Sequence, residues 1–176
     1  MSSKEPEIVL IDNFIENSNT LFVSLRDNIV WDERIRARKT ASFGVAYDYS
    51  AITYPEVEMY SDLIPICNKI EAEIGFLPNN CLLNYYPDGN STMGYHSDSA
   101  KELKVGTGVA IISLGSTRYI SFRSKADKDI KFEYKLGCGG LLYMDKTIQD
   151  NWMHAIPKQG GAGERISLSF RGCFKS

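Results

Sequence analysis

The pattern of apolar and polar positions differs between the two halves of this chain. In the first 80 residues, apolar positions recur twice with the 3.6-residue period of an amphipathic helix. They predict helices at about 17–28 and 61–74, and Gly75 is typical of the position after a helix. We expect both helices to pack as supports against a sheet.

From Cys81 onward, short runs of strand-forming residues alternate with turn residues. The predicted strands are about 82–86, 107–113, 118–123, 130–135, 140–144, 153–156 and 165–171, with one more at 8–11. The predicted turns are 87–90, 115–116, 125–127, 137 and 160–163. Many short strands behind a helical front predict an α+β, mainly β protein, built as a β-sandwich or jelly roll with helices on one side.

Length and composition predict one globular domain that needs no membrane. A chain of 176 residues with 43% hydrophobic and 24% charged residues can bury a sizeable core. No apolar run reaches the ~18 residues of a membrane helix, and we expect no secretory signal at the start. The four cysteines have no metal-binding spacing, which favours a cytoplasmic protein, or a nuclear one in a eukaryote.

The only two histidines lie where a metal site would need them. His96 and Asp98 form an H-x-D pair, whose side chains share one face if the segment is extended. His154 comes from a distant predicted strand. Two histidines and one carboxylate are the usual ligands of non-haem Fe(II) oxygenases. An isolated H-x-D often binds nothing, so the pair needs support from other residues.

The predicted strand at 165–171 gives that support. Three apolar residues alternate with two serines and, at the two ends, with Arg165 and Arg171. Arginine binds carboxylates through paired hydrogen bonds. Beside iron ligands, this polar face favours a site for 2-oxoglutarate. By itself it would also suit an edge strand with solvated arginines.

A basic run at 34–39 and the tyrosines that follow it suggest a nucleic-acid contact. Positive charge beside aromatic rings suits a single strand or a flipped base. The alternative is a solvated charged loop next to core tyrosines. The net charge of −2 argues against tight non-specific binding to duplex DNA, which depends on phosphate neutralisation.

Several blocks, in this order and spacing, resemble the AlkB family of Fe(II)/2-oxoglutarate dioxygenases over about residues 30 to 173. The blocks are Asn84-Tyr85-Tyr86-Pro87-Asp88-Gly89, Met93-Gly94-Tyr95-His96-Ser97-Asp98, Ser113-Leu114-Gly115, Phe122-Arg123, Trp152-Met153-His154-Ala155-Ile156-Pro157 and Arg165 to Arg171. Upstream, Arg38-Lys39-Thr40-Ala41-Ser42-Phe43-Gly44 resembles the P-R-x-x-x-x-[FY]-G segment of the family, with Ala37 in place of the proline. Ser167 stands where the family often has Asn.

The resemblance implies a fold, a ligand set and a reaction. The fold is a double-stranded β-helix, a distorted jelly roll, with 81–174 as its catalytic core and 1–80 as a helical and substrate-lid part. The implied Fe(II) ligands are His96, Asp98 and His154. The implied contacts of 2-oxoglutarate, which is used with O2, are Arg165 and Tyr86 at its distal carboxylate, Asn84 and Arg171 near its other end, and Ser167. Oxidation of an N-methyl group would release formaldehyde, succinate and CO2.

The residues leave two substrate classes open. An alkylated base in DNA or RNA is favoured by Tyr47 and Tyr49 as stacking rings near Phe43, and by Arg36, Arg38 and Lys39 as phosphate contacts. A free nucleoside, nucleotide or other small metabolite is the alternative.

DNA-repair members of the family carry an acidic residue two places after the iron Asp, and it contacts the base. Here that place holds Ala100, preceded by Ser99, and the next acid is Glu102. The missing acid favours the small-molecule alternative. The complete ligand set disfavours an inactive binding module, and nothing in the sequence requires more than a monomer.

Overall fold

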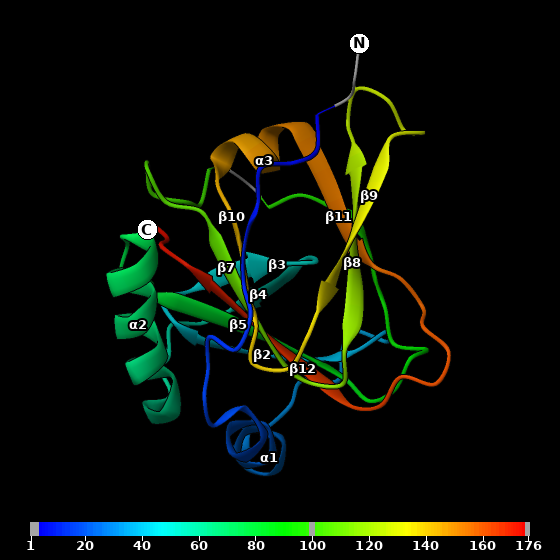
Figure 1. Ribbon diagram of the computed structural model, residues 1–176. Coiled ribbons are helices and arrows are strands. Elements are labelled where there is room, and N and C mark those ends of the chain that lie inside the picture. Colours follow the sequence, from blue (N-terminus) through cyan, green and yellow to red (C-terminus); the bar gives the residue numbers. More distant parts are fainter. Residues whose placement is uncertain (1–3, 99–100, 175–176) are drawn as a thin grey trace.

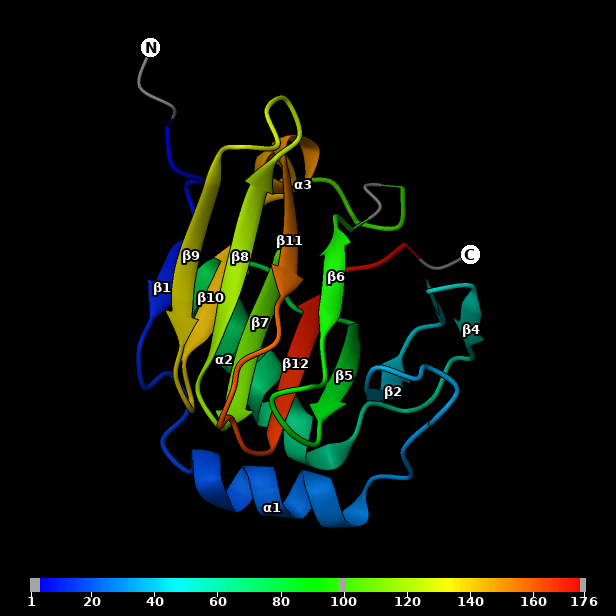
Figure 2. The same cartoon turned by 90° about the vertical axis from the view of Figure 1, so that its right-hand side faces the viewer.

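Two antiparallel sheets that face each other form the centre of the molecule, in a computed structural model that describes residues 4–98 and 101–174 (Figures 1 and 2). The major sheet contains β1 (Val9–Ile11), β2 (Lys39–Gly44), β5 (Asn80–Tyr86), β7 (Val109–Gly115), β10 (Leu141–Met144) and β12 (Arg165–Arg171). The minor sheet contains β6 (Met93–His96), β8 (Arg118–Ser124), β9 (Lys131–Leu136) and β11 (Trp152–Ile156). Their strand orders are β1-β10-β7-β12-β5-β2 and β6-β11-β8-β9, as expected of the predicted jelly roll.

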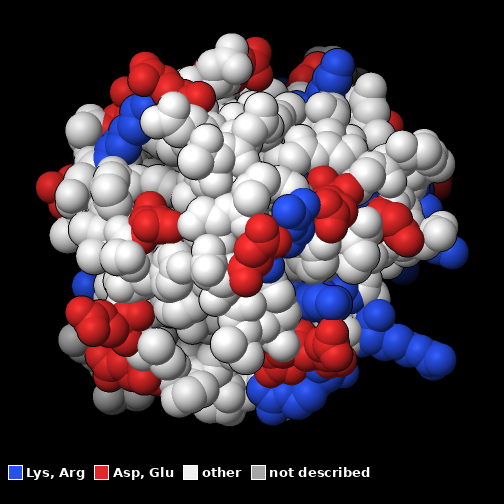
Figure 3. All heavy atoms as spheres, turned by 90° about the horizontal axis from the view of Figure 1, so that it is seen from below, with Lys and Arg blue, Asp and Glu red and all other residues white. Residues whose placement is uncertain are grey.

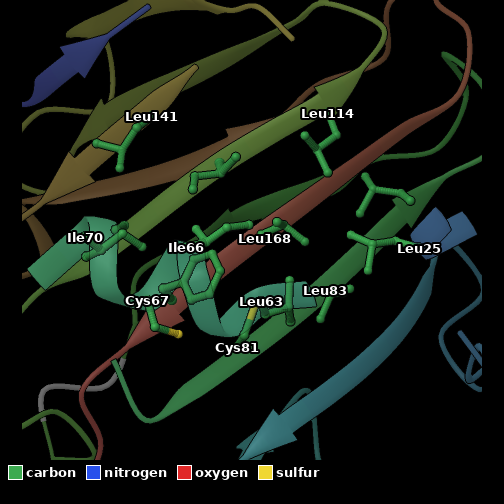
Figure 4. Close-up of a cluster of buried hydrophobic side chains, with 14 of the residues drawn as sticks. Leu25, Leu63, Ile66, Cys67, Ile70, Cys81, Leu83, Leu114, Leu141 and Leu168 are labelled. Atoms are coloured by element: carbon green, nitrogen blue, oxygen red, sulfur yellow. The ribbon is translucent and has the colours of Figure 1, made fainter. Parts of the chain in front are cut away.

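Two helices pack against the major sheet on the side away from the minor sheet and beneath it (Figure 2). They are α1 (Ser18–Asn28) and α2 (Ile64–Ile74), and α2 follows the short 3-10 helix η1 (Ser61–Leu63). Their apolar faces meet the sheet in one hydrophobic cluster, which includes Leu25, Leu63, Ile66, Ile70, Leu83, Leu114 and Leu168 (Figure 4). Each fully buried aliphatic side chain contributes roughly 1.5–3 kcal/mol. Both helices therefore support the sheet, as the sequence predicts.

The two faces of strand β12 lie in different environments. It lies inside the major sheet, paired with β5 on one side and β7 on the other, so it is not an edge strand. Its apolar residues, Ile166, Leu168 and Phe170, belong to the helix-facing cluster. Its four polar residues, Arg165, Ser167, Ser169 and Arg171, line a cavity between the sheets. The predicted alternation is confirmed, and the alternative of solvated arginines is excluded because both arginines are buried.

The first 80 residues contain strands as well as the predicted helices. β1 and β2 form the two edges of the major sheet, while β3 (Tyr47–Tyr49) and β4 (Ile52–Tyr54) form a separate two-stranded sheet. β1 confirms the strand predicted at 8–11. The other three strands were not predicted, because they are defined by their pairing partners, which a local pattern does not reveal. β7 begins and ends two residues later than the predicted 107–113, because its pairing with β12 continues to Gly115.

A short helix that the periodicity does not predict, α3 (Lys146–Asn151), precedes β11. Six residues are too few to show a helical period, but a cap identifies the start. The side chain of Asp145 accepts a hydrogen bond from the Ile148 N–H at 3.0 Å. No helix in the described part of the chain is long and apolar enough to cross a membrane.

Candidate active site

His96, Asp98 and His154 meet at one end of the space between the sheets. His96 on β6 and His154 on β11 are direct cross-strand partners, and their ring centroids are 4.3 Å apart. Asp98 follows β6 two residues after His96. One possible ligand atom from each residue lies within 4.8 Å of the other two. The three side chains that the sequence predicts as metal ligands therefore converge.

Neighbouring groups orient these three side chains. The Nδ1 atom of His96 is 2.9 Å from the Gly94 carbonyl oxygen, so a proton on Nδ1 leaves Nε2 free for a metal. The Asp98 N–H donates to Oε1 of Gln149 at 2.8 Å. Gln149 is buried on α3, so this helix fixes the segment that carries Asp98. Sequence reasoning missed Gln149, because its only signal is the capping residue Asp145, directly before a helix too short to recognise.

A buried ion pair joins Asp98 to Arg171. Nη2 of Arg171 is 3.1 Å from Oδ2 of Asp98, and the two side chains are only 4% and 3% exposed. Burial alone would raise the pKa of Asp98, but Arg171 and the two histidines hold it below its usual value. Arg171, predicted near the 1-carboxylate of the co-substrate, thus contacts a predicted metal ligand and keeps it ionised.

The charge states in this cluster suit a divalent metal. Burial, helped by His96, lowers the pKa of His154 to about 3, so its ring is neutral and can donate a lone pair. Two imidazoles and one carboxylate match the donor preference of non-haem Fe(II). The residues present therefore fit the metal that the AlkB resemblance implies.

The opposite end of the cavity carries unsatisfied donors. Nη2 of Arg165 donates to Oγ of Ser113 at 2.9 Å. Within the described residues, Nε and Nη1 of Arg165 and the hydroxyl of Tyr86 are buried without a hydrogen-bond partner. A buried guanidinium that lacks a counter-charge costs several kcal/mol. A carboxylate placed here would satisfy these donors, as predicted for the distal carboxylate of 2-oxoglutarate.

Asn84 and Ser167 lie between the two ends. They are direct partners across β5 and β12, and both line the cavity. Oδ1 of Asn84 accepts from Nε of Arg38 at 2.8 Å, while Nδ2 of Asn84 has no partner among the described residues. The cavity thus combines a metal-ligand end, a polar middle with a free donor, and a cationic closed end. A linear 2-oxo dicarboxylate fits this order of groups.

Replacing Arg165 with methionine tests the closed end of the cavity. We expect the concentration of 2-oxoglutarate for half-maximal turnover to rise about 10- to 100-fold, because the distal carboxylate loses a charge-assisted fork. Metal affinity should change little, since Arg165 is at the far end of the cavity from the three ligands. Titration of 2-oxoglutarate in a succinate-formation assay measures the effect, with the exposed Arg34→Met as a matched control. An unchanged requirement would place the co-substrate elsewhere.

A groove leads from the metal-ligand cluster to the surface. Its lining includes Tyr47, Asp48, Tyr49, Tyr95 and Glu102. The Tyr49 ring lies edge-on to His96, with centroids 6.5 Å apart. Tyr47 is buried, and Arg171 lies 4.7 Å from the centre of its ring, so that side of the ring is already covered. Arg38 lies 5.5 Å from the centre of the Tyr49 ring, but Tyr49 is only partly buried. Of the two tyrosines predicted to stack on a base, Tyr49 is therefore the better placed.

The groove carries two acidic side chains that sequence analysis did not assign. No salt bridge to Asp48 or Glu102 occurs within the described part of the chain. Both carboxylates line the groove, and burial together with the charge of Asp48 raises the pKa of Glu102. Asp48 and Glu102 therefore supply negative charge to the groove. Ser99 and Ala100 themselves lie outside the described residues.

The predicted basic run is largely neutralised by its own neighbours. Arg34 pairs with Asp32, and Nζ of Lys39 is 3.0 Å from Oε1 of Glu33. Arg38 is buried and donates to Asn84, to the Thr92 carbonyl at 3.1 Å and to the Tyr49 hydroxyl. Arg38 lines the groove, but each of its three nitrogens already donates to a protein group, so we infer that it supports the site and does not contact a phosphate.

The remaining two predicted substrate contacts have different surroundings. Arg36 is exposed and stays a candidate for a phosphate contact. Phe43 packs on Tyr60, with ring centroids 5.3 Å apart, against the helix-facing cluster and away from the groove. The view from below shows acidic and basic side chains side by side, with no continuous basic patch on that face (Figure 3).

Comparisons with known proteins agree with this geometry. The family model described as the 2OG-Fe(II) oxygenase superfamily matches residues 24–171. The chain is 29% identical to alpha-ketoglutarate-dependent dioxygenase alkB homolog 3 of Bos taurus, over 89% of this chain and 62% of that protein. It is 29% identical to DNA oxidative demethylase ALKBH2 of Homo sapiens, over 76% of this chain and 56% of that protein. The chain thus spans about three-fifths of the length of these curated relatives.

A structural likeness supports the fold separately. A solved structure described as that of OsALKBH1 superposes with a TM-score of 0.70 and covers 97% of this chain and 100% of that chain. Its sequence identity is 16%, so this likeness concerns the fold. The predicted fold class, mainly β with a double-stranded β-helix and supporting helices, is confirmed. On the ordered sequence blocks, the family model and these relatives, the chain belongs to the 2OG-Fe(II) oxygenase superfamily and, within it, to the AlkB family.

Proposed function

We propose that this chain is an Fe(II)- and 2-oxoglutarate-dependent dioxygenase that oxidatively demethylates an N-alkylated base in DNA or RNA. The observation that carries the proposal is the position of the three metal ligands. They lie where the polar cavity along β12 meets a groove walled by Tyr49. A co-substrate can enter the cavity while a second molecule reaches the same metal through the groove.

Each part of the site has a separate task in this reaction. His96, Asp98 and His154 would hold Fe(II), and Arg165 with Tyr86 would hold the distal carboxylate of 2-oxoglutarate. With O2, the bound metal and co-substrate supply the oxidant for hydroxylation of a C–H bond, coupled to formation of succinate and CO2. Arg171 keeps Asp98 ionised, and the apolar cavity walls, among them Ile111 and Ile120, exclude water.

The product of that hydroxylation explains demethylation. Insertion of one oxygen atom into a C–H bond of an N-methyl group gives an N-hydroxymethyl group. Its N–C bond then breaks and the electron pair of that bond returns to the nitrogen. The carbon leaves as formaldehyde, and the hydroxyl proton passes to the nitrogen of a neutral base or to solvent from a cationic one. The protein therefore only has to hold the methyl carbon near the metal, which the groove wall at Tyr49 and His96 would do.

The acidic groove suits a positively charged base. Methylation at a ring nitrogen of adenine or cytosine leaves a cationic ring, and a cation is attracted by the carboxylates of Asp48 and Glu102 in the groove. Arg38 also lines the groove and lies 5.5 Å from the centre of the Tyr49 ring, so this attraction rests on the two carboxylates. A neutral alkylated base would gain less. This arrangement supports a base substrate even without an acid at position 100.

A free nucleoside, nucleotide or other small metabolite is the second candidate, favoured by one observation. The basic run that would contact phosphates is paired with Asp32 and Glu33 or, at Arg38, buried. Only Arg36 of the predicted phosphate contacts remains exposed without an ion pair among the described residues. A single arginine gives little affinity for a long strand.

The decisive experiment offers both substrate classes to one preparation. The protein is incubated with Fe(II), ascorbate, 2-oxoglutarate and air, together with methylated single-stranded DNA and RNA or the matching free nucleosides and nucleotides. We expect mass spectrometry to show loss of a methyl group from an oligomer, with formaldehyde and succinate in equal amounts. Binding of that oligomer should weaken steeply as salt rises, whereas a neutral nucleoside should be nearly indifferent. Oxidation of free nucleosides or nucleotides alone would replace the proposal with the second candidate.

A further inference from the structure

Arg118, the first residue of β8, is buried beside Tyr86 at the closed end of the cavity. Its side chain is fully buried, and its guanidinium carbon lies 5.5 Å from the centre of the Tyr86 ring. Arg165 contacts the same ring, at 5.1 Å. Two guanidinium groups therefore pack on one tyrosine, whose hydroxyl has no hydrogen-bond partner among the described residues. The predicted co-substrate contacts do not include Arg118.

Within the described residues, the side-chain hydrogen bonds of Arg118 all go to backbone carbonyls. Nη2 donates to the carbonyl oxygens of Ser91 at 2.9 Å and Pro157 at 2.8 Å, and Nη1 donates to that of Asp88 at 3.3 Å. These carbonyls belong to the turn after β5 and the segment after β11. Arg118 thus ties together two loops that close this end of the space between the sheets.

The buried Arg118, Arg165 and Arg171 differ in their counter-charges. Arg171 is paired with Asp98, as described above. No carboxylate forms a salt bridge with Arg118 or Arg165 within the described residues. Burial lowers the pKa of Arg165, and the charge of Arg118 lowers it further. Two like charges held together away from water are unfavourable until an anion joins them.

We propose that Arg118 is a positioning residue for the co-substrate that favours a 2-oxo acid with a distal carboxylate over one without. It acts in two ways. Its charge adds to that of Arg165 at the place where the distal carboxylate would lie. Its contacts with Tyr86 and the two loops hold the Tyr86 hydroxyl toward the cavity. The selectivity for a dicarboxylate would therefore depend on both Arg118 and Arg165, although of these two only Arg165 lines the cavity.

Binding measured without turnover tests this role. The protein is loaded with Mn(II), which does not support the oxidation, and titrated by calorimetry with 2-oxoglutarate and with 2-oxopentanoate, which has the same chain length without the distal carboxylate. In Arg118→Met we expect the affinity for 2-oxoglutarate to fall about tenfold, because the positive charge beside Arg165 and the support of Tyr86 are lost, while the affinity for 2-oxopentanoate stays within about twofold. The matched control is Arg34→Met, an exposed arginine, which should change neither affinity.

The ratio of the two affinities separates positioning from general structural damage. A variant with a distorted cavity would lose both ligands equally, and that result would overturn the proposal, as would an unchanged ratio. Arg118→Lys keeps the charge without the planar guanidinium. Circular dichroism should show that this variant is folded, and calorimetry should give a ratio of the two affinities within about threefold of the wild type. If Arg118→Met does not fold, a folded Arg118→Lys whose ratio falls tenfold or more contradicts the proposed role of the charge. None of these outcomes depends on whether nucleic acid is the substrate.

Discussion

Replacing His96 with alanine is expected to abolish turnover while leaving the fold intact. The imidazole supplies one of three ligands, and a site reduced to Asp98 and His154 should hold Fe(II) too weakly for the reaction, with a loss of at least ~10³-fold in succinate formation. Stability should change by less than about 1 kcal/mol, because His96 is only partly buried and its ring makes a single hydrogen bond within the described residues, to Gly94.

Three measurements on His96→Ala separate these effects. Calorimetry with Mn(II) should show weaker metal binding, urea unfolding of the metal-free protein should be near that of the wild type, and added imidazole should restore part of the turnover by filling the cavity. Arg34→Met again serves as the surface control. A folded variant that forms succinate at the normal rate would exclude His96 as a ligand.

Separating Asp98 from Arg171 is expected to give the largest loss of stability of any single change in the site. Either Asp98→Ala or Arg171→Met leaves the other charge buried without a partner, at a cost of about 3–5 kcal/mol. The double variant removes both charges, so it should be less destabilised than the sum of the two single variants by about 2 kcal/mol or more. Urea unfolding of the metal-free protein measures all four members of this cycle.

The cycle also distinguishes the structural role of the pair from the metal site. The double variant should recover stability relative to either single variant, yet it should bind no more metal than Asp98→Ala, because the carboxylate ligand is still missing. If the two single effects simply add, the ion pair is not the source of the loss. If the double variant regains metal binding, Asp98 is not a ligand.

Local periodicity was sufficient to predict the orientation of those side chains of the site that lie on regular strands. In β12, the period of two assigns alternate residues to opposite faces whatever the rest of the fold, so Arg165 and Arg171 had to lie on one polar face. The same rule placed His96 and Asp98 together as soon as the segment was taken as extended. The order of the short sequence blocks then identified the family, because each block holds its residues at a spacing set by local geometry.

Only the tertiary structure decided which partner each of these side chains has. Asp98 contacts Arg171 across 73 residues of sequence and Gln149 across 51, and Arg118 reaches a carbonyl 39 residues away. The basic run looked available for phosphates until its pairs with Asp32 and Glu33 and the burial of Arg38 were visible. A short-range pattern reports the face on which a residue lies, whereas charge, burial and hydrogen bonding depend on strands that meet only after folding. The sequence by itself therefore determined which residues could bind the metal and the co-substrate. The packing of the two sheets decided which charged side chains are paired and which remain free to bind a ligand.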